Sequence, residues 1–248
     1  MQILPRIHLV GSGASGFDLT DAIDSHVYLV DGNHSWALID AGGGRDPQFI
    51  LANIAASGVD TDRPGTLFLT HGHADHSGGA AAMRAAYPHL RVMAGSVVAR
   101  WVSEGDLDGI SLSRAQAGGT YPADYVYTAC AGVEALADGE VFDLGGATIT
   151  AVDTPGHADG HTCYFLVTED GMKILFSGDC VFTGGRVSVQ NIHDSRIGPY
   201  AASIARLDLL GIDALLPGHY SFSIQRASRH VAVAQGRFSQ ALLPQNVP

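Results

Sequence analysis

The sequence predicts one α+β domain in which β-hairpins and βα units are mixed, and three observations support this class. The chain has 248 residues, of which 46% are hydrophobic and 16% are charged, so it can bury a sizeable core and is too apolar to be disordered. Short β-like runs alternate with amphipathic stretches, which is typical of βα units. Gly-Gly and Asp-Gly pairs join several of the runs, which indicates hairpins. No linker divides residues 1–248, so we expect a single domain.

The predicted strands are short runs with the residue preferences of β-structure, bounded by turn residues. They cover residues 4–10, 26–30, 37–40, 66–70, 91–94, 140–144, 147–153, 162–168, 173–177 and 213–216.

Two helices are predicted from their ends and their apolar faces. Asp46 and Pro47 supply an N-cap and a proline in the first turn, and Gly58 ends that helix. The second helix begins at Pro199 and is closed by Gly211. Residues at about 96–128 are less regular, so we expect an irregular insert of helix or loop there.

A glycine-rich run at residues 11–16, GSGASG, matches the G-x-G-x-x-G pattern of dinucleotide-binding sites. Such a site also needs a helix that begins at the loop, because the helix N-terminus binds the pyrophosphate. The chain leads into a strand at 26–30 instead. We therefore expect a glycine-rich hairpin loop at the rim of the domain and no nucleotide cofactor.

Histidine is abundant in a chain that is otherwise acidic and poor in charge. There are 12 histidines, 14 lysines and arginines and 25 acidic residues, which gives a net charge of −11. A general attraction to nucleic acid or to an anionic membrane is therefore absent, and we expect neither as a partner. The three cysteines have no C-x-x-C spacing and the N-terminus has no signal-peptide pattern, so we expect reduced thiols and a cytoplasmic location.

Residues of metal-ligand type follow four of the predicted strands. The sequence HGHADH at 71–76 places four potential ligands within six residues, directly after the strand at 66–70. His157, Asp179 and His219 each follow another strand, after a glycine, a proline or both. Strand ends are where folds that combine helices and strands usually place catalytic groups. Imidazole and carboxylate suit zinc, iron or manganese, and seven ligands suit two ions rather than one.

This set resembles the signature of the metallo-β-lactamase superfamily, H-x-H-x-D-H followed by a later His, Asp and His. The resemblance extends to the flanking residues 38–42 and covers nearly the whole chain. It implies an αββα sandwich, in which two mixed sheets pack face to face with helices outside. It also implies the ligand sets, which are His71, His73 and His157 for one ion, Asp75, His76 and His219 for the other, and Asp179 between the two.

The resemblance further implies a hydrolase with two divalent ions. We expect zinc, with iron and manganese as alternatives, and a hydroxide shared by the two ions as the nucleophile that attacks a carbonyl. Asp75 is then both a ligand and a candidate proton carrier for the leaving group.

Asp179 indicates a branch of the superfamily. True β-lactamases generally have Cys or no carboxylate at that position, whereas glyoxalase II-like thioesterases and lactonases have Asp. Residues 178–185, GDCVFTGG, resemble the glyoxalase II-like pattern G-D-x-L-F-x-G-G, with Val181 in place of Leu. Phe182 stands where acyl-homoserine lactonases commonly have Tyr. We therefore expect a small-molecule substrate with an ester, thioester or lactone bond.

Other activities remain open at this point. Residues 154–160, TPGHADG, also resemble the persulfide dioxygenase branch, whose members use a single iron. A β-lactam-hydrolysing activity is a second alternative. A nuclease is disfavoured because the chain lacks a basic surface, and a metal-stabilised binding module is disfavoured because the ligand set is complete.

Several further residues are expected near the site. His193 falls in a segment that overhangs it and is a candidate for contact with substrate, and Tyr220 follows His219 and is a candidate donor to an oxyanion. His161, Asp40 and Asp153 are expected to hold ligands or loops in place rather than to bind metal. Candidates for an apolar pocket or for the core are Phe17, Trp36, Trp101, Tyr125 and Phe222. The irregular insert offers a surface for a homodimer.

Overall fold

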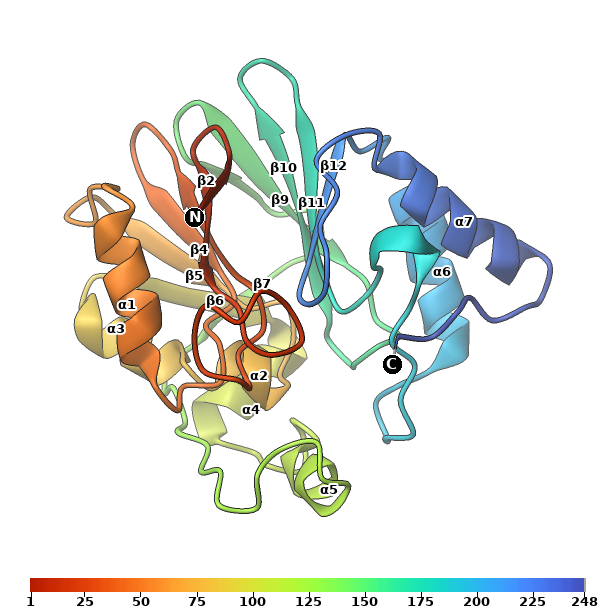
Figure 1. Cartoon of the computed structure of the whole chain (residues 1–248), viewed down its shortest axis with the longest axis horizontal. Coiled ribbons are helices and arrows are strands. Elements are labelled where there is room, and N and C mark those ends of the chain that lie inside the picture. Colours follow the sequence, from red (N-terminus) through yellow and green to blue (C-terminus); the bar gives the residue numbers. More distant parts are fainter. Residues whose placement is uncertain (248) are drawn as a thin grey trace.

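Two β-sheets lie face to face at the centre of the molecule, and helices cover their outer faces (Figure 1). The computed structural model describes residues 1–247. Helices α1 (Pro47–Ala56) and α3 (Ala80–Ala86) cover one sheet, and helices α6 (Ile197–Asp208) and α7 (Ser228–Ser239) cover the other. This arrangement confirms the predicted αββα sandwich.

The first sheet has seven strands in sequence order. The strands are β1 (Gln2–Leu4), β2 (Ile7–Gly11), β3 (Val27–Asp31), β4 (Trp36–Ile39), β5 (Gly65–Phe68), β6 (Arg91–Gly95) and β7 (Glu134–Leu136). Neighbours from β1 to β4 are antiparallel, and neighbours from β4 to β7 are parallel. Helices cross over between the parallel strands, including α2 (Ala74–Ser77), α4 (Ser96–Glu104) and α5 (Leu112–Ala117).

The second sheet has five strands in the order β12, β11, β10, β9, β8. The strands are β8 (Val141–Asp143), β9 (Ala147–Asp153), β10 (Thr162–Thr168), β11 (Lys173–Gly178) and β12 (Ala214–Pro217). The pairs from β8 to β11 are antiparallel, and β11 pairs with β12 in parallel. A short 3-10 helix, η1 (Thr183–Gly185), and α6 connect β11 to β12.

Alternate side chains of the strands enter different layers, as the two-residue period of a strand requires. In β3, Tyr28 and Val30 pack between the two sheets, whereas Leu29 packs against the helices outside the first sheet. Tyr164 and Phe176 fill the space between the sheets from the opposite side. Each such fully buried side chain contributes about 1.5–3 kcal/mol, so the layer between the sheets fixes their relative position.

Some elements differ from the sequence prediction. The single strand expected at 4–10 is wrong, because the chain reverses at Pro5 and Arg6 and forms the β1–β2 hairpin. Arg6 adopts a φ of +63°, a turn conformation that its residue type does not signal. Strand β7 and helix α7 were not predicted, since β7 has only three residues and α7 has no capping side chain.

The insert, residues 96–128, contains α4, α5 and an irregular segment after them. Its aromatic residues form a small core of their own, in which Trp101, Tyr121 and Tyr125 pack with Ile110 and Leu112. Helix α5 lies at one end of the sandwich, away from the helices that cover the sheets (Figure 1). The insert therefore stands beside the end of the molecule at which the candidate ligands gather.

The glycine-rich run at 11–16 forms turns, and the next regular element is β3. The amide of Gly13 donates to the carbonyl of Asp24, and the amide of Tyr220 donates to the carbonyl of Ser15. The run therefore lies in the connection of the β2–β3 hairpin, as predicted, and the structure places it next to residue 220. None of the helices in residues 1–247 is both long and apolar enough to cross a membrane.

Candidate metal centre

The predicted ligands lie together at one end of the sandwich, although they come from four separate places in the sequence. His71 and His73 follow β5, and Asp75 and His76 lie in the short helix α2. The remaining ligands follow β9, β11 and β12. Three groups of these side chains bring their ligand atoms within 4.8 Å of one another: His71, His73 and His157; His71, His76 and Asp179; and Asp75, His76 and His219.

The ligand atoms approach one another closely. Nε2 of His157 is 3.1 Å from Nδ1 of His73, and Nε2 of His219 is 3.0 Å from Oδ2 of Asp75. The Asp179 carboxylate lies between these two pairs, since its Oδ2 is 3.7 Å from Nε2 of His157 and 3.6 Å from Nε2 of His219. Its position agrees with the bridging place that the resemblance implies.

Hydrogen bonds on the far side of the rings fix which nitrogen faces the centre. Nδ1 of His157 donates to the carbonyl of Ser188 at 2.8 Å, and Nδ1 of His76 lies 2.8 Å from the Asp40 carboxylate. Both partners only accept hydrogen bonds, so Nδ1 carries the proton in each ring. In the neutral ring Nε2 then presents a lone pair to the centre, which is the state of a histidine that binds metal.

His71 is oriented through a longer chain of hydrogen bonds. The hydroxyl of Thr70 donates its proton to the Asp40 carboxylate. Nδ1 of His71 lies 3.0 Å from the same hydroxyl oxygen, so Nδ1 is the donor in that hydrogen bond. Asp40 thus holds His76 directly and His71 through Thr70, in line with its predicted supporting role. Asp153 lies at the exposed end of β9, and among the described contacts it makes none with a ligand.

A divalent cation fits this donor set. Nε2 of His71 and Oδ1 of Asp179 are buried and have no hydrogen-bond partner among the described residues. A buried polar atom without a partner is costly, and here the lone pairs of several such atoms converge. Imidazole nitrogens and carboxylate oxygens are ligands of zinc, iron and manganese, so these residues could hold a metal.

Burial and charge shift the pKa values of the imidazoles in two directions. Burial lowers the pKa of His157 to about 4 and that of His71 well below its usual range, so both rings are neutral at pH 7. Burial also acts to lower the pKa of His76 and His219, but the nearby carboxylates outweigh it and raise both. A divalent cation would supply the positive charge that these carboxylates favour.

His161 lies behind the centre and belongs to none of the three ligand groups. Its Nε2 accepts a hydrogen bond of 3.2 Å from the amide of Asp179, and its Nδ1 lies 2.9 Å from the hydroxyl of Thr154. His161 therefore positions the Asp179 backbone, in line with its predicted supporting role.

Cys180 is buried, and its pKa is raised by a hydrogen bond with Cys163 and by burial.

Asp194 is a residue near the centre that the sequence did not indicate. It is buried, and its Oδ2 lies 3.7 Å from Nε2 of His73, a distance for an electrostatic contact rather than a hydrogen bond. Its Oδ1 accepts a hydrogen bond of 3.0 Å from Ser111 of the insert. His193 lies next to this pair with 51% of its side chain exposed, and its Nδ1 is 3.3 Å from the Ser111 hydroxyl. Contact between His193 and substrate stays a prediction.

Two tyrosines lie at the opening of the centre. Tyr220 has a φ of +62°, its carbonyl accepts a hydrogen bond from Nε2 of His26, and its ring packs against Phe182 at 5.7 Å. These contacts hold the backbone of Tyr220 in place. The role of the Tyr220 side chain as a donor to an oxyanion stays a prediction. Tyr121 of the insert donates a hydrogen bond of 2.5 Å to Oδ1 of Asp75. Sequence reasoning missed this contact, because no spacing links residue 121 to the motif at 71–76.

A cleft of about 510 Å³ opens above the centre. Its walls come from the glycine-rich loop, the insert and residues 188–192. The aromatic residues predicted for the pocket or the core lie mostly elsewhere: Trp36 packs in the core, Trp101 and Tyr125 pack inside the insert, and Phe17 and Phe222 pack on each other at 5.3 Å. The cleft is therefore more polar than that set of residues suggests.

Comparison with known proteins identifies the family. The family model described as the metallo-beta-lactamase superfamily matches residues 20–219. The chain belongs to the metallo-β-lactamase superfamily. The matched segment contains every one of the seven candidate ligands, so the resemblance stated on the motif is confirmed.

Two relatives of this superfamily member are named as thioesterases. An acyl-coenzyme A thioesterase of Bos taurus is 30% identical over 224 residues, which cover 83% of this chain and 76% of that protein. An atrochrysone carboxyl ACP thioesterase of Aspergillus fumigatus is 29% identical over 223 residues, 88% of this chain. The match spans 59% of that protein's length.

Solved structures of the superfamily share the fold. A metallo-β-lactamase with a HARLDQ motif from Cronobacter sakazakii superposes with a TM-score of 0.73 at 22% identity, covering 97% of this chain and 96% of the other. A metallo-β-lactamase family protein from Thermus thermophilus superposes with a TM-score of 0.70 at 23% identity. The superposition covers 96% of this chain and 80% of the Thermus protein. These similarities concern the fold alone.

Proposed function

We propose that this superfamily member is a metal-dependent thioesterase that cleaves small acyl thioesters. The observation that carries the proposal is the convergence of five imidazoles and two carboxylates at the base of the cleft. Two divalent ions at such a place, with zinc as the proposed metal, lower the pKa of water to near neutrality and polarise a carbonyl oxygen. The chain then needs no serine or cysteine nucleophile.

The residues divide into two sets around Asp179. In the proposed arrangement His71, His73 and His157 would hold one ion, Asp75, His76 and His219 would hold the other, and Asp179 would be shared by the two sets. Asp40, Ser188 and His161 keep the ligands in their orientation through the hydrogen bonds described above.

Asp75 is the proposed proton carrier for the leaving group. Tyr121 fixes its Oδ1, while its Oδ2 faces His219. A ligated carboxylate is a weak source of protons, but a thiol has a pKa of about 8.5 and leaves as a thiolate with little assistance. The arrangement therefore suits a thioester better than an amide, whose leaving amine must be protonated.

Two further residues are proposed to contact the substrate. Tyr220 lines the cleft beside His219 and could donate to the carbonyl oxygen. His193 lies on the outer side of Ser111, where it could meet a group that extends out of the cleft. The thioesterase names of the bovine and Aspergillus relatives support the choice of a thioester over a lactone or a simple ester.

The test is a substrate panel with metal analysis. Protein loaded with zinc, manganese or iron is assayed with an acyl thioester, an ester, a lactone and a β-lactam, and metal content is measured for each preparation. We expect release of free thiol as the fastest reaction, with two ions per chain. One iron per chain with oxygen uptake on a persulfide, or faster opening of the β-lactam, would overturn the proposal.

The variant Asp75→Asn separates binding from turnover. It keeps His71, His73 and His157, so much of the first ion's binding should remain while thioester cleavage is lost. The exposed Asp62→Asn serves as a control with unchanged metal content and activity. Retained turnover in Asp75→Asn would remove the proposed proton-carrying role.

A further inference from the structure

Arg114 is the only lysine or arginine among the described residues that line the cleft. It belongs to α5 of the insert and is exposed. The arginines of residues 1–247 that form ion pairs with carboxylates are Arg6, Arg63, Arg91, Arg196 and Arg206, and Arg114 is not one of them. Its guanidinium group is therefore available to a ligand in the cleft.

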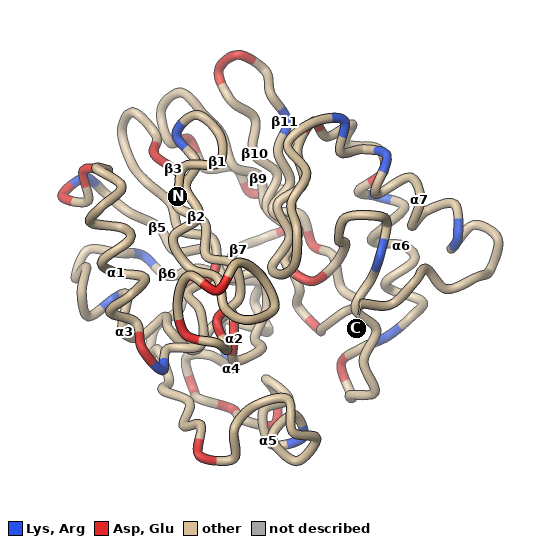
Figure 2. The backbone as a smooth tube through the Cα atoms, in the orientation of Figure 1, with Lys and Arg blue, Asp and Glu red and all other residues tan. Residues whose placement is uncertain are grey.

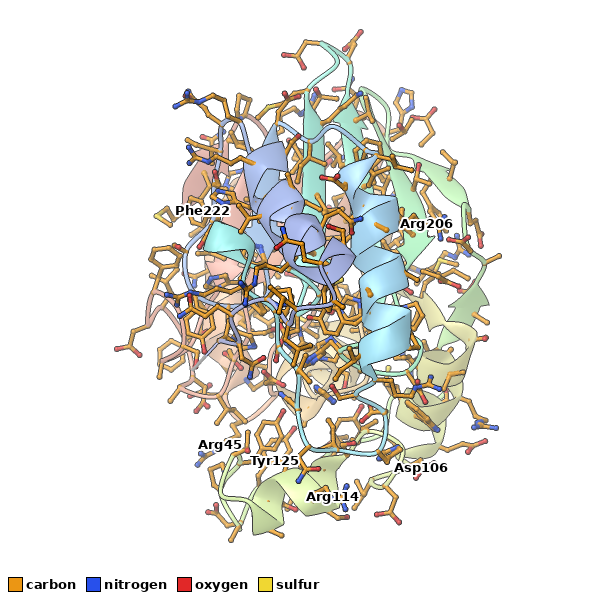
Figure 3. The ribbon with its side chains drawn as sticks, turned by 90° about the vertical axis from the view of Figure 1, so that its right-hand side faces the viewer. Arg45, Asp106, Arg114, Tyr125, Arg206 and Phe222 are labelled. Atoms are coloured by element: carbon orange, nitrogen blue, oxygen red, sulfur yellow. The ribbon has the colours of Figure 1, made fainter. Side chains whose placement is uncertain are left out.

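The backbone that carries Arg114 is held firmly. Gln116 donates hydrogen bonds to the carbonyls of Pro122 and Tyr125, at 3.1 and 2.9 Å. Leu112 is buried in the small core of the insert. Figure 3 shows Arg114 on the insert, next to the loop that descends before α6, and the cleft is lined from both sides there. These contacts fix the position of the α5 backbone from which the Arg114 side chain extends.

Arg114 supplies a local positive charge in an acidic chain. The chain has a net charge of −11, and Figure 2 shows acidic residues distributed over the backbone, with a basic position on α5. The two carboxylates that line the cleft, Asp75 and Asp179, face the candidate metal centre instead. Among the described residues that line the cleft, Arg114 is the permanently charged cation outside the candidate metal centre that an anionic substrate group could meet.

We propose that Arg114 binds a carboxylate on the acyl chain of the substrate, so that the enzyme prefers thioesters of acids with a second carboxyl group. The inference rests on the proposed thioesterase function. The planar guanidinium presents two parallel N–H donors that match the two oxygens of a carboxylate. Arg114 is then a specificity-determining residue that acts on substrate binding rather than on the bond that breaks.

The position of Arg114 favours the acyl chain over the thiol as the source of the anion. Ser111 lies three residues earlier and contacts Asp194, whose Oδ2 is 3.7 Å from Nε2 of the ligand His73. Arg114 and the ligands His73 and Asp75 thus line the same cleft, on the side where Ser111 and Asp194 connect the insert to His73. The phosphate of a phosphopantetheine thiol is separated from its sulfur by a long arm with two amide bonds, so comparing a coenzyme A thioester with a thioester of an uncharged thiol distinguishes the two sources of the anion.

The experiment compares glutaryl and pentanoyl thioesters of the uncharged thiol N-acetylcysteamine, which differ in the terminal carboxylate. In Arg114→Gln we expect KM for the glutaryl thioester to rise about tenfold, which is the effect of losing one charge-assisted hydrogen bond. We expect kcat to stay unchanged. The pentanoyl thioester should show no change, and Arg114→Lys should recover part of the loss. Arg100→Gln, which removes an exposed arginine of α4 outside the cleft lining, is the matched control.

Each outcome decides the inference separately from the proposed function. If the wild-type protein cleaves both thioesters and Arg114→Gln affects both equally or neither, the inference is wrong while the thioesterase function stands. A second comparison uses pentanoyl-coenzyme A and pentanoyl-N-acetylcysteamine. If Arg114→Gln raises KM for the coenzyme A thioester alone, the anion belongs to the thiol and the acyl assignment is overturned.

Discussion

Ser111 donates a hydrogen bond of 3.0 Å to Asp194, and this bond joins the insert to the loop before α6 directly beside the ligand His73. Both residues of the pair are buried. The insert and the loop are thereby fixed relative to the candidate metal centre, although neither contributes a ligand.

Asp194→Asn should weaken metal binding by about 10- to 100-fold, because the carboxylate 3.7 Å from Nε2 of His73 acts electrostatically on that ring and makes it a stronger ligand. Ser111→Ala should also weaken metal binding, but by a smaller factor than Asp194→Asn. Chelator competition measures the affinity, and Asp159→Asn, which breaks an exposed ion pair with Arg196, is the control. Equal affinities in wild type and Asp194→Asn would show that the loop only covers the cleft.

Tyr121→Phe should lower kcat about tenfold and leave the fold intact, because the hydroxyl holds Oδ1 of Asp75. Burial, together with the Asp75 charge, keeps the pKa of Tyr121 well above its usual range, so the hydroxyl remains a donor at any working pH. Tyr125→Phe loses a hydrogen bond to the carbonyl of Gly43 instead. We expect that control to lower the free energy of unfolding by about 1 kcal/mol with kcat unchanged. An equal kcat in both variants would contradict the role of Tyr121.

Metal removal should destabilise the protein as well as inactivate it. The converging lone pairs and carboxylates of the centre are held together only at a cost when no cation is bound. At a free zinc concentration a thousandfold above Kd, binding adds about 4 kcal/mol to the free energy of unfolding. Thermal unfolding of chelated and zinc-restored protein measures this, and an unchanged Tm would place the metal outside this centre.

Asp24 should make the stability depend on pH. Burial raises the pKa of this carboxyl to about 6, outweighing its hydrogen bonds with Thr20 and Gly43. Because the folded pKa lies above the unfolded one, the protonated form contributes stability that is full below about pH 4 and is lost as the pH rises through 6. Asp24→Asn should therefore be more stable than wild type at pH 7, by about 2 to 3 kcal/mol, and equal to it near pH 4.

Urea unfolding at pH 4, 5, 6 and 7 measures this dependence. Asp62→Asn, at an exposed position, should unfold as the wild type does at each pH. A constant difference between Asp24→Asn and wild type across the series would show that Asp24 does not titrate in this range.

Much of the fold could be predicted where local patterns repeat and end clearly. The strands at 147–153 and 162–168 have the predicted bounds, because each forms a regular antiparallel ladder between turns. The run at 4–10 was misread, because its apolar residues continue across a reversal that depends on the β1–β2 pairing. Strand propensity does not specify with which segment a strand pairs.

The sequence by itself determined the family, the seven candidate ligands and their place at strand ends, because the ligand motif is compact and strand ends meet at one edge of a sheet. Only the tertiary structure decided which side chains surround those ligands. Asp194, Tyr121 and Arg114 lie in a loop and an insert whose course depends on packing between distant segments. No local periodicity encodes such contacts, so their roles become visible only when the chain is folded.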